Sequence, residues 1–472
     1  MSGSTTRSRG STSLLHCDVL VCGGGVAGTM AAVAAARHGA HVVLLERYGF
    51  LGGNATAGAV AQFNSWQTVN GRRVVAGLAS EVVERLRRYG AAGEHHCFVM
   101  STGHKMDRVE YAPEVLKLVL DDMVTEAGIQ PLLHAGVLDV QCHGRRVETA
   151  DVLTKGGVLA IKPRVRIDAS GDMDALRSAG ANFLELDEGE ALQPATMMFR
   201  YGPIDFGRLD ALQPAEIDAL ARRGYEQGDL ARAALHSARD PFSSDGWFNI
   251  SRLGIDATDP LALGRAEIEG RRQAWRAASY LRAAVPGCEH GRLIAFGTQI
   301  GVRETRRMEG DHVLTAEELL RPYEFDDAIA AGAYPIDIHP AAGGELVYAA
   351  LGDDHAYQIP YRSLIPTALD NVLVAGRGLS ATHKALAAVR VMTISMAVAR
   401  LPELRLRLLW KAASGGACAM LPFLRCKPRS WPAEHVCADA AWHFWHCWDD
   451  LFDPRANARI SPDERRVPDF MA

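Results

Sequence analysis

The sequence lacks a membrane-spanning hydrophobic run and an excess of basic charge. No apolar stretch approaches the roughly 18 to 20 residues that a bilayer-spanning helix needs. The net charge is −5, so no global basic field would attract nucleic acid or an anionic membrane. We therefore expect neither as a partner. Residues 1–14 are polar and lack the apolar core of a signal peptide, which predicts a disordered lead-in and, by default, a cytoplasmic protein.

Closely spaced cysteines and lysines are also scarce. The nine cysteines include no Cys-x-x-Cys pair, so neither a zinc ribbon, a cysteine-ligated cluster nor a redox disulfide is indicated. Seven lysines accompany 44 arginines, a usage typical of a GC-rich bacterial genome rather than of a binding surface. Hydrophobic residues make up 48% and charged residues 23%, as in a soluble globular protein. With 472 residues, the chain is expected to form two domains.

A glycine-rich turn near the start organises the sequence. Residues 17–22 form a short apolar run typical of a buried parallel strand, and they lead into Gly23-Gly24-Gly25-Val26-Ala27-Gly28. An alanine-rich helix over 26–38 and a second strand over 41–45 follow, ending in Glu46. A glycine turn can be purely structural, but strand, G-x-G-x-x-G, helix and acid in this order predict a dinucleotide-binding unit. Its amides would face a pyrophosphate and its acid a ribose.

The segments after this unit resemble a known family. The loop 47–58 is rich in glycine and small residues, and it resembles the flavin-binding segment of the FAD-dependent oxidoreductases related to the fumarate reductase and succinate dehydrogenase flavoproteins. Residues 111–117, the turn 167–172 and the strand and glycine turn at 371–383 resemble the same family. The similarity covers about residues 17–396. It implies noncovalent FAD, because the loop has no histidine where some relatives attach the cofactor.

The resemblance also implies which residues contact FAD. The loop 53–56 would contact the pyrophosphate and the isoalloxazine ring, the turn 168–172 the adenosine half, and a strand over 132–140 the adenine. A helix beginning at 390–392 would face the pyrimidine edge of the flavin. The implied cofactor-binding residues are Gly23, Gly25, Val26, Ala27, Gly28, Glu46, Arg47, Gly53, Asn54, Thr56, Val137, Asp168, Gly171, Asp172, Gly376, Arg377, Arg390 and Val391.

The expected fold class is α/β. We expect a discontinuous Rossmann-like FAD-binding domain, residues 15–182 and 340–400, with a parallel sheet and a β-meander over 147–167. An inserted α+β substrate-facing domain would occupy 183–339, with helices over 215–227 and 260–284.

The composition shifts after residue 400 toward tryptophan and cysteine, which predicts an irregular extension over 401–472 or the product of a frameshift. Histidines and cysteines in this extension could be read as metal ligands. No zinc spacing matches, so we expect no metal.

Five residues are candidates for catalysis. Arg303 and Arg362 are suited to bind an anion, because the guanidinium fork donates two parallel hydrogen bonds. His339, Tyr361 and His383 are candidates for proton transfer. Arginines in the stretch 303–307 could equally form a salt-bridged face.

The sequence thus predicts hydride transfer between a small organic substrate and FAD. The dehydrogenase or oxidase direction, with oxygen or another carrier as electron acceptor, is favoured because no second dinucleotide fingerprint is visible. Alternatives are a fumarate-reductase-like alkene reductase, a flavin-binding protein without turnover and an NAD-dependent dehydrogenase. The sequence indicates no oligomeric state.

Overall fold

The computed structural model describes residues 14–99, 105–339 and 347–399. The predicted C-terminal extension with its candidate metal ligands, and the predicted lead-in apart from Leu14, lie outside these residues. No helix in the described ranges is long and apolar enough to cross a membrane.

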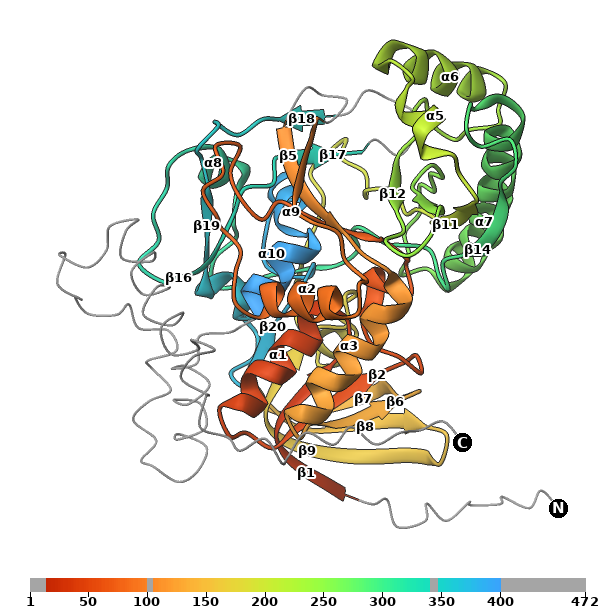
Figure 1. Ribbon diagram of the computed structural model, residues 1–472. Coiled ribbons are helices and arrows are strands. Elements are labelled where there is room, and N and C mark those ends of the chain that lie inside the picture. The colour runs from red at the N-terminus through yellow and green to blue at the C-terminus, as the bar shows by residue number, and fades with distance from the viewer. Residues whose placement is uncertain (1–13, 100–104, 340–346, 400–472) are drawn as a thin grey trace, which may run out of the picture. The chain divides into compact units, whose positions relative to one another are not determined.

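A parallel sheet forms the centre of the predicted FAD-binding domain (Figure 1). Its parallel strands, in spatial order, are β6 (Gln130–Leu133), β2 (Val42–Glu46), β1 (Leu14–Cys22), β9 (Gly157–Asp168) and β20 (Val372–Val374). Every residue of β2 is buried, as expected for an apolar strand covered on both faces. Helix α1 (Val26–Arg37) follows β1, and α3 (Pro113–Glu126) packs between α1 and α2 (Leu78–Arg88). The predicted α/β, Rossmann-like fold is confirmed.

An antiparallel meander packs on the parallel sheet. It consists of β7 (Gly136–His143), β8 (Arg146–Thr154) and the first half of β9, which continues into the parallel sheet. Its buried side chains, Val140 and Val152 among them, share one hydrophobic cluster with Leu20 and Val43 of the parallel strands. The meander was predicted correctly. The prediction of one strand over 132–140 was wrong: His134 adopts a positive φ of 52°, which ends β6 and separates it from β7.

The region 183–339 contains a second sheet with its own core. Its strand order is β12 (Ser237–Arg239), β13 (Gly246–Phe248), β11 (Phe199–Gly202) and β14 (Arg292–Phe296). Helices α5 (Phe206–Asp210), α6 (Pro214–Glu226) and α7 (Pro260–Ala284) lie with it, in green in Figure 1. Small residues on α7, such as Ala274 and Ala277, pack with Phe199 and Phe248 in a separate cluster. The two predicted helices are present, while the domain boundaries stay a prediction.

Short elements connect the two sheets. They are η1 (Gly53–Ala55), β3 (Gln62–Asn64), β4 (His96–Val99), β5 (Lys105–Glu110), α4 (Asp174–Ser178), β10 (Phe183–Leu184), β15 (Arg307–Met308), α8 (Ala316–Leu320), β16 (Ala328–Gly332), β17 (Ile336–Ile338), β18 (Val347–Ala349), β19 (Tyr357–Pro360) and η2 (Tyr361–Leu364). Pairing joins β10 to β15, β16 to β19, β17 to β18, and β5 to both β3 and β4.

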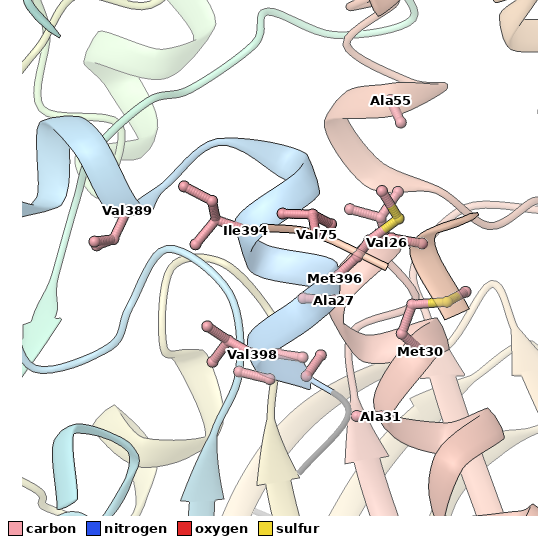
Figure 2. Close-up of a cluster of buried hydrophobic side chains, with 14 of the residues drawn as sticks. Val26, Ala27, Met30, Ala31, Ala55, Val75, Val389, Ile394, Met396 and Val398 are labelled. Atoms are coloured by element: carbon pink, nitrogen blue, oxygen red, sulfur yellow. The ribbon is translucent and has the colours of Figure 1, made fainter. Parts of the chain in front are cut away.

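The last described helices support the start of α1. Helix α9 (His383–Val389) is followed by α10 (Met392–Ala399), so the helix expected from 390–392 begins at Met392. Figure 2 shows Met396 of α10 beside Val26 of α1. Both residues belong to one buried cluster with Val398 of α10 and Met30 of α1. The first turn of α1 is therefore held in place by an element that is more than 350 residues away in the sequence.

Candidate active site

The glycine turn between β1 and α1 is shaped for a ligand that approaches the backbone. Gly23 has φ +104°, and a Cβ on Gly28 would lie 1.9 Å from the Gly23 carbonyl oxygen, so neither position accepts a larger residue without strain. Gly25 has φ −63° and ψ 173°, and a Cβ on it would have the Gly53 Cα, at 3.9 Å, as its nearest neighbour. No side chain caps the helix start. This open, positively polarised helix terminus fits the pyrophosphate of FAD.

The loop after β2, residues 47–58, closes against this turn, and we call it the FAD loop. The Gly52 amide donates a hydrogen bond to the Gly24 carbonyl oxygen at 2.8 Å, and a Cβ on Gly53 would lie 3.0 Å from the Gly25 Cα. Thr56 Oγ1 donates to the Leu51 carbonyl oxygen at 2.6 Å, which closes the loop on itself. Of the predicted contact residues, Gly53 therefore lies beside the glycine turn, and Thr56 stabilises the loop that contains Gly53.

Glu46 lies at the end of β2, also beside the turn. Its carboxylate accepts hydrogen bonds from the amides of Gly24 at 2.8 Å and Tyr48 at 3.0 Å. Burial raises the pKa of Glu46. In this position the Glu46 carboxylate could accept hydrogen bonds from ribose hydroxyls, the role that the sequence predicts for it. The neighbouring Arg47 instead donates to Gln299 Oε1 at 2.8 Å.

Asp168, at the end of β9, fixes the shape of the second turn. Its side chain accepts hydrogen bonds from the Ser170 amide at 3.0 Å, the Ser170 hydroxyl at 2.7 Å and the Leu176 amide at 2.8 Å. Burial raises the pKa of Asp168 to about 6. Because both carboxylate oxygens are used within the loop 168–176, Asp168 orders this loop.

Asp172 joins three segments at the same edge of the sheet. Its carboxylate pairs with Arg377 Nη2 at 2.5 Å and accepts the Thr305 hydroxyl at 2.8 Å. A Cβ on Gly171 would lie 3.0 Å from the Arg377 guanidinium, and one on Gly376 3.3 Å from the Ala27 Cβ. The two later turns therefore pack against each other and against α1.

Two further predicted FAD contacts, Val137 in β7 and Val391 between α9 and α10, are both half-buried.

Asn54 connects the FAD loop to the candidate substrate site. Its Nδ2 donates to the Val302 carbonyl oxygen at 3.0 Å, so the next residue, Arg303, lies close to this loop. Arg303 Nη1 donates to the Thr196 hydroxyl at 2.8 Å. Burial lowers the pKa of Arg303 to about 9, and the nearby charges of Arg390, Arg232 and Arg252 lower it further. We call Arg232, Arg252, Arg303 and Arg390 the arginine cluster.

Asp337 and His339 lie within the arginine cluster. His339 Nε2 is 3.3 Å from Asp337 Oδ2, which also accepts the Tyr334 hydroxyl at 3.0 Å. Burial lowers the pKa of His339 to about 4, and Arg303 and Arg232 add to this effect while Asp337 opposes it. Burial alone would raise the pKa of Asp337, but the hydrogen bond from His339 and the Arg390 charge hold it below its usual value. The pair is therefore a neutral imidazole oriented by a carboxylate.

The other catalytic candidates have partners of their own. Arg362 binds Asp327 with two nitrogens, at 3.1 and 3.2 Å, so its fork is already occupied and we do not assign it a substrate. His383 is buried, and its Nδ1 lies 2.8 Å from Glu304. Tyr361 is buried in η2.

Sequence reasoning missed Arg232, Arg252 and Asp337. Asp337 and His339 are two residues apart around β17, and side chains at this spacing point to the same side of a strand. This two-residue spacing was visible in the sequence and could have identified Asp337. Arg232 and Arg252 lie in loops after α6 and β13, where no periodic pattern marks a functional side chain.

The chain resembles several flavoproteins of known structure. A p-nitrophenol 4-monooxygenase from Pseudomonas putida DLL-E4 is 12% identical, with 95% of this chain and 92% of that chain covered and a TM-score of 0.46. A geranylgeranyl bacteriochlorophyll reductase-like protein from Thermoplasma acidophilum is 12% identical, with coverages of 85% and 79% and a TM-score of 0.45. The flavin-dependent brominase Bmp2 is 12% identical, with coverages of 87% and 82% and a TM-score of 0.47. These likenesses are too distant to indicate a substrate.

No curated protein shows significant similarity to the chain. A family model does: the model described as FAD dependent oxidoreductase matches residues 18–400. The glycine cradle at Gly25 and the turns around it fit the cofactor of that family. The chain belongs to the FAD dependent oxidoreductase family, and FAD is its cofactor.

Proposed function

We propose that the protein dehydrogenates a small organic anion and that His339 accepts the proton released. FAD supplies the two-electron acceptor for the hydride when it is bound. The observation that supports this proposal is the neutral imidazole of His339 beside the Asp337 carboxylate. Both lie within the arginine cluster, whose member Arg303 directly follows the Val302 contact with the FAD loop.

Arg303 is the proposed anchor for the anion. Its guanidinium makes hydrogen bonds to the Pro194 carbonyl oxygen and the Thr196 hydroxyl through Nη1, and no acidic side chain of the described residues forms an ion pair with it. A planar fork with free donors binds a carboxylate through two parallel hydrogen bonds. An anion held there would lie near the loop that contains Asn54.

The protonation state of His339 supports the dehydrogenase direction. With a pKa of about 4, the imidazole is neutral near pH 7, so it can accept a proton but is a poor donor. When Nε2 donates to Asp337, Nδ1 keeps its lone pair. Arg252 Nη2 lies 3.5 Å from Nδ1, so Arg252 must move aside for a substrate proton to reach this nitrogen. A substrate C–H bond would then break with its electron pair leaving as hydride, while an O–H or N–H proton moves to Nδ1. Reduction of an alkene would instead require a protonated donor.

Two partners follow from this proposal. One is the small-molecule substrate, and the other is an electron acceptor, oxygen or another carrier, that reoxidises the cofactor. Neither a nucleic acid nor a membrane has a part in it. We propose a cytoplasmic location, because a soluble substrate and acceptor suffice.

The test uses the purified holoprotein. We expect a flavin absorption spectrum that bleaches when one member of a panel of hydroxy and amino acids is added without oxygen. Arg303→Gln should then raise the substrate KM about 10- to 100-fold, the effect of losing a charge-assisted hydrogen-bond pair, while FAD occupancy stays unchanged. Arg265→Gln, an exposed residue of α7, is the control. Loss of FAD from Arg303→Gln, or an unchanged KM, would contradict the assigned role.

A further inference from the structure

Arg252 lies on the nitrogen to which the proposed function delivers the substrate proton. Its Nη2 is 3.5 Å from His339 Nδ1, while His339 Nε2 lies 3.3 Å from Asp337 Oδ2. A guanidinium can only donate hydrogen bonds and an ionised carboxylate can only accept them, so both contacts select the tautomer with its proton on Nε2. The arrangement therefore holds the tautomer that can take a proton, but it covers the nitrogen that would take it.

The backbone of Arg252 is fixed from two sides. Its amide donates to Gln273 Oε1 on α7 at 2.8 Å. The next residue, Leu253, exchanges two backbone hydrogen bonds with Ala195, at 2.8 and 3.0 Å. Any displacement of the guanidinium from His339 is therefore a rotation of the side chain about a fixed backbone.

The same pairing of segments brings Arg252 close to the proposed anion anchor. Arg303 Nη1 donates to the Thr196 hydroxyl at 2.8 Å, and that hydroxyl donates to the Ser251 carbonyl oxygen at 3.3 Å. Ser251 directly precedes Arg252 in the chain. Two hydrogen bonds and one peptide unit thus connect the Arg303 guanidinium to the Arg252 backbone, and an anion bound at Arg303 is within reach of the long Arg252 side chain.

No acidic side chain holds Arg252 at His339. Within the described residues its guanidinium forms no ion pair, and the contact with Nδ1 is a single hydrogen bond to a neutral ring. Burial lowers the pKa of Arg252, so its positive charge is incompletely compensated. A carboxylate or phosphate offers this guanidinium two parallel hydrogen bonds and an opposite charge. An incoming anion therefore competes successfully with the imidazole for Arg252.

We propose that Arg252 is a cap over the His339 base and that the anionic group of the substrate removes it. The anion draws the guanidinium away from Nδ1, and the O–H or N–H group of the same substrate takes its place. This inference rests on the proposed function, because it concerns the same base. Arg252 thereby makes the anion necessary for proton transfer as well as for binding, so the site selects hydroxy or amino acids over the corresponding uncharged alcohols and amines.

The cap is tested by NMR of the oxidised holoenzyme with ¹⁵N-labelled histidine at pH 7. His339→Gln assigns the signals. An unprotonated imidazole nitrogen resonates further downfield when it accepts no hydrogen bond. We expect acetate, but not its neutral isostere acetamide, to move the wild-type Nδ1 signal downfield. In Arg252→Met the signal should lie downfield without acetate, and in Arg252→Lys it should lie in between, because lysine keeps a donor. A wild-type signal that ignores acetate, or that coincides with the Arg252→Met signal, would overturn the inference.

Flavin reduction provides a second readout. The acid that bleaches the flavin is compared with its primary amide, which keeps the reacting O–H or N–H group and lacks the charge. Arg252→Met should accelerate reduction by the amide about tenfold or more, as expected when a hydrogen bond from a charged donor no longer covers the base, and should slow reduction by the acid. Arg265→Met, at an exposed position of α7, should change neither rate. An unchanged amide rate in Arg252→Met would show that Arg252 only binds the anion.

The outcomes separate this inference from the proposed function. If no panel member bleaches the flavin while the Nδ1 signals respond as expected, the dehydrogenase proposal is refuted and the cap stands. If an acid bleaches the flavin while the His339 signals of the wild type and Arg252→Met coincide, the cap alone is refuted.

Discussion

At the scale of single residues, the site depends on how neighbours set the state of one imidazole. His339 is neutral because burial and the charges of Arg303 and Arg232 disfavour its protonated form. Asp337 opposes this shift and, by accepting from Nε2, fixes which nitrogen can take a proton. Asp337 is therefore a positioning residue for the proposed base.

This arrangement predicts the pH dependence of activity. Because the neutral imidazole is the active form, kcat/KM should be flat above about pH 5 and fall as the pH decreases through the His339 pKa of about 4. Arg303, Arg232 and Arg252 face the ring as cations and Asp337 as an anion. The fall in kcat/KM at acid pH should therefore lie below the pH at which an ordinary histidine titrates. The measurement is kcat/KM between pH 4 and 8 with the substrate found by flavin bleaching. An acid limb near pH 6.5 would contradict this assignment.

Replacement of Asp337 gives the matching variant. Asp337→Asn should lower kcat about 100-fold across the plateau, because the tautomer is no longer fixed, while KM changes little. It should also move the acid limb below that of the wild type, since the carboxylate no longer supports the protonated ring. Asp326→Asn, at an exposed carboxylate 3.7 Å from Arg362, is the control. A loss of protein stability with an unmoved acid limb would indicate a merely structural role.

At the scale of elements, the strand–turn–helix unit follows from local sequence. Buried apolar runs, glycines at fixed offsets and an alanine-rich helix act within about 30 residues, and β1, α1 and β2 formed as predicted. The one misjudged strand, 132–140, failed because a single positive φ at His134 does not register in hydrophobic periodicity. The alternation of side chains in a strand could have paired Asp337 with His339. Arg232 and Arg252 lie in loops, where no such pattern marks a functional side chain.

Two glycines of the same turn should respond differently to alanine. Gly25→Ala meets no atom within 3.9 Å and keeps an allowed backbone, so the stability of the protein without FAD should change by less than about 1 kcal/mol. Its methyl group occupies the cradle for the pyrophosphate, so FAD affinity should fall about 100-fold, as for two lost charge-assisted hydrogen bonds. Denaturant unfolding and FAD titration measure the two effects.

Gly28→Ala is the contrasting variant. Its Cβ would lie 1.9 Å from the Gly23 carbonyl oxygen, so the helix must move away from the strand and the protein without FAD should itself be destabilised. Full FAD affinity in Gly25→Ala, or equal destabilisation by both substitutions, would show that the open side of Gly25 is not the cofactor cradle.

At the scale of the whole molecule, the FAD site is assembled from distant parts of the chain. Gly376 lies against Ala27 of the first turn, and Asp172 of the second turn binds Thr305 and Arg377. The FAD loop reaches Val302 through Asn54. A cofactor bound among these segments stabilises the folded state by mass action. At a free FAD concentration of 100 times Kd the gain is about 2.7 kcal/mol. The melting temperature should therefore rise with added FAD.

Two ion pairs near β20 test this assembly. Arg377→Gln removes the link between the last glycine turn and Asp172 and should weaken FAD binding about tenfold or more, which reduces the FAD-dependent rise in melting temperature. Arg145→Gln removes a partly exposed pair with Asp370 just before β20 and should leave FAD affinity unchanged, since such pairs contribute about 0 to 1 kcal/mol. Equal effects of the two variants would contradict a specific role for Arg377.

The contact of Arg377 with Asp172 also bears on biosynthesis. A ribosome must release residue 377 from its exit tunnel before Asp172, in the second turn of the nucleotide site, can form its ion pair. The nascent chain therefore waits through most of its translation with an unfinished nucleotide site. We therefore expect FAD to bind with full affinity only late in synthesis, after Arg377 has emerged.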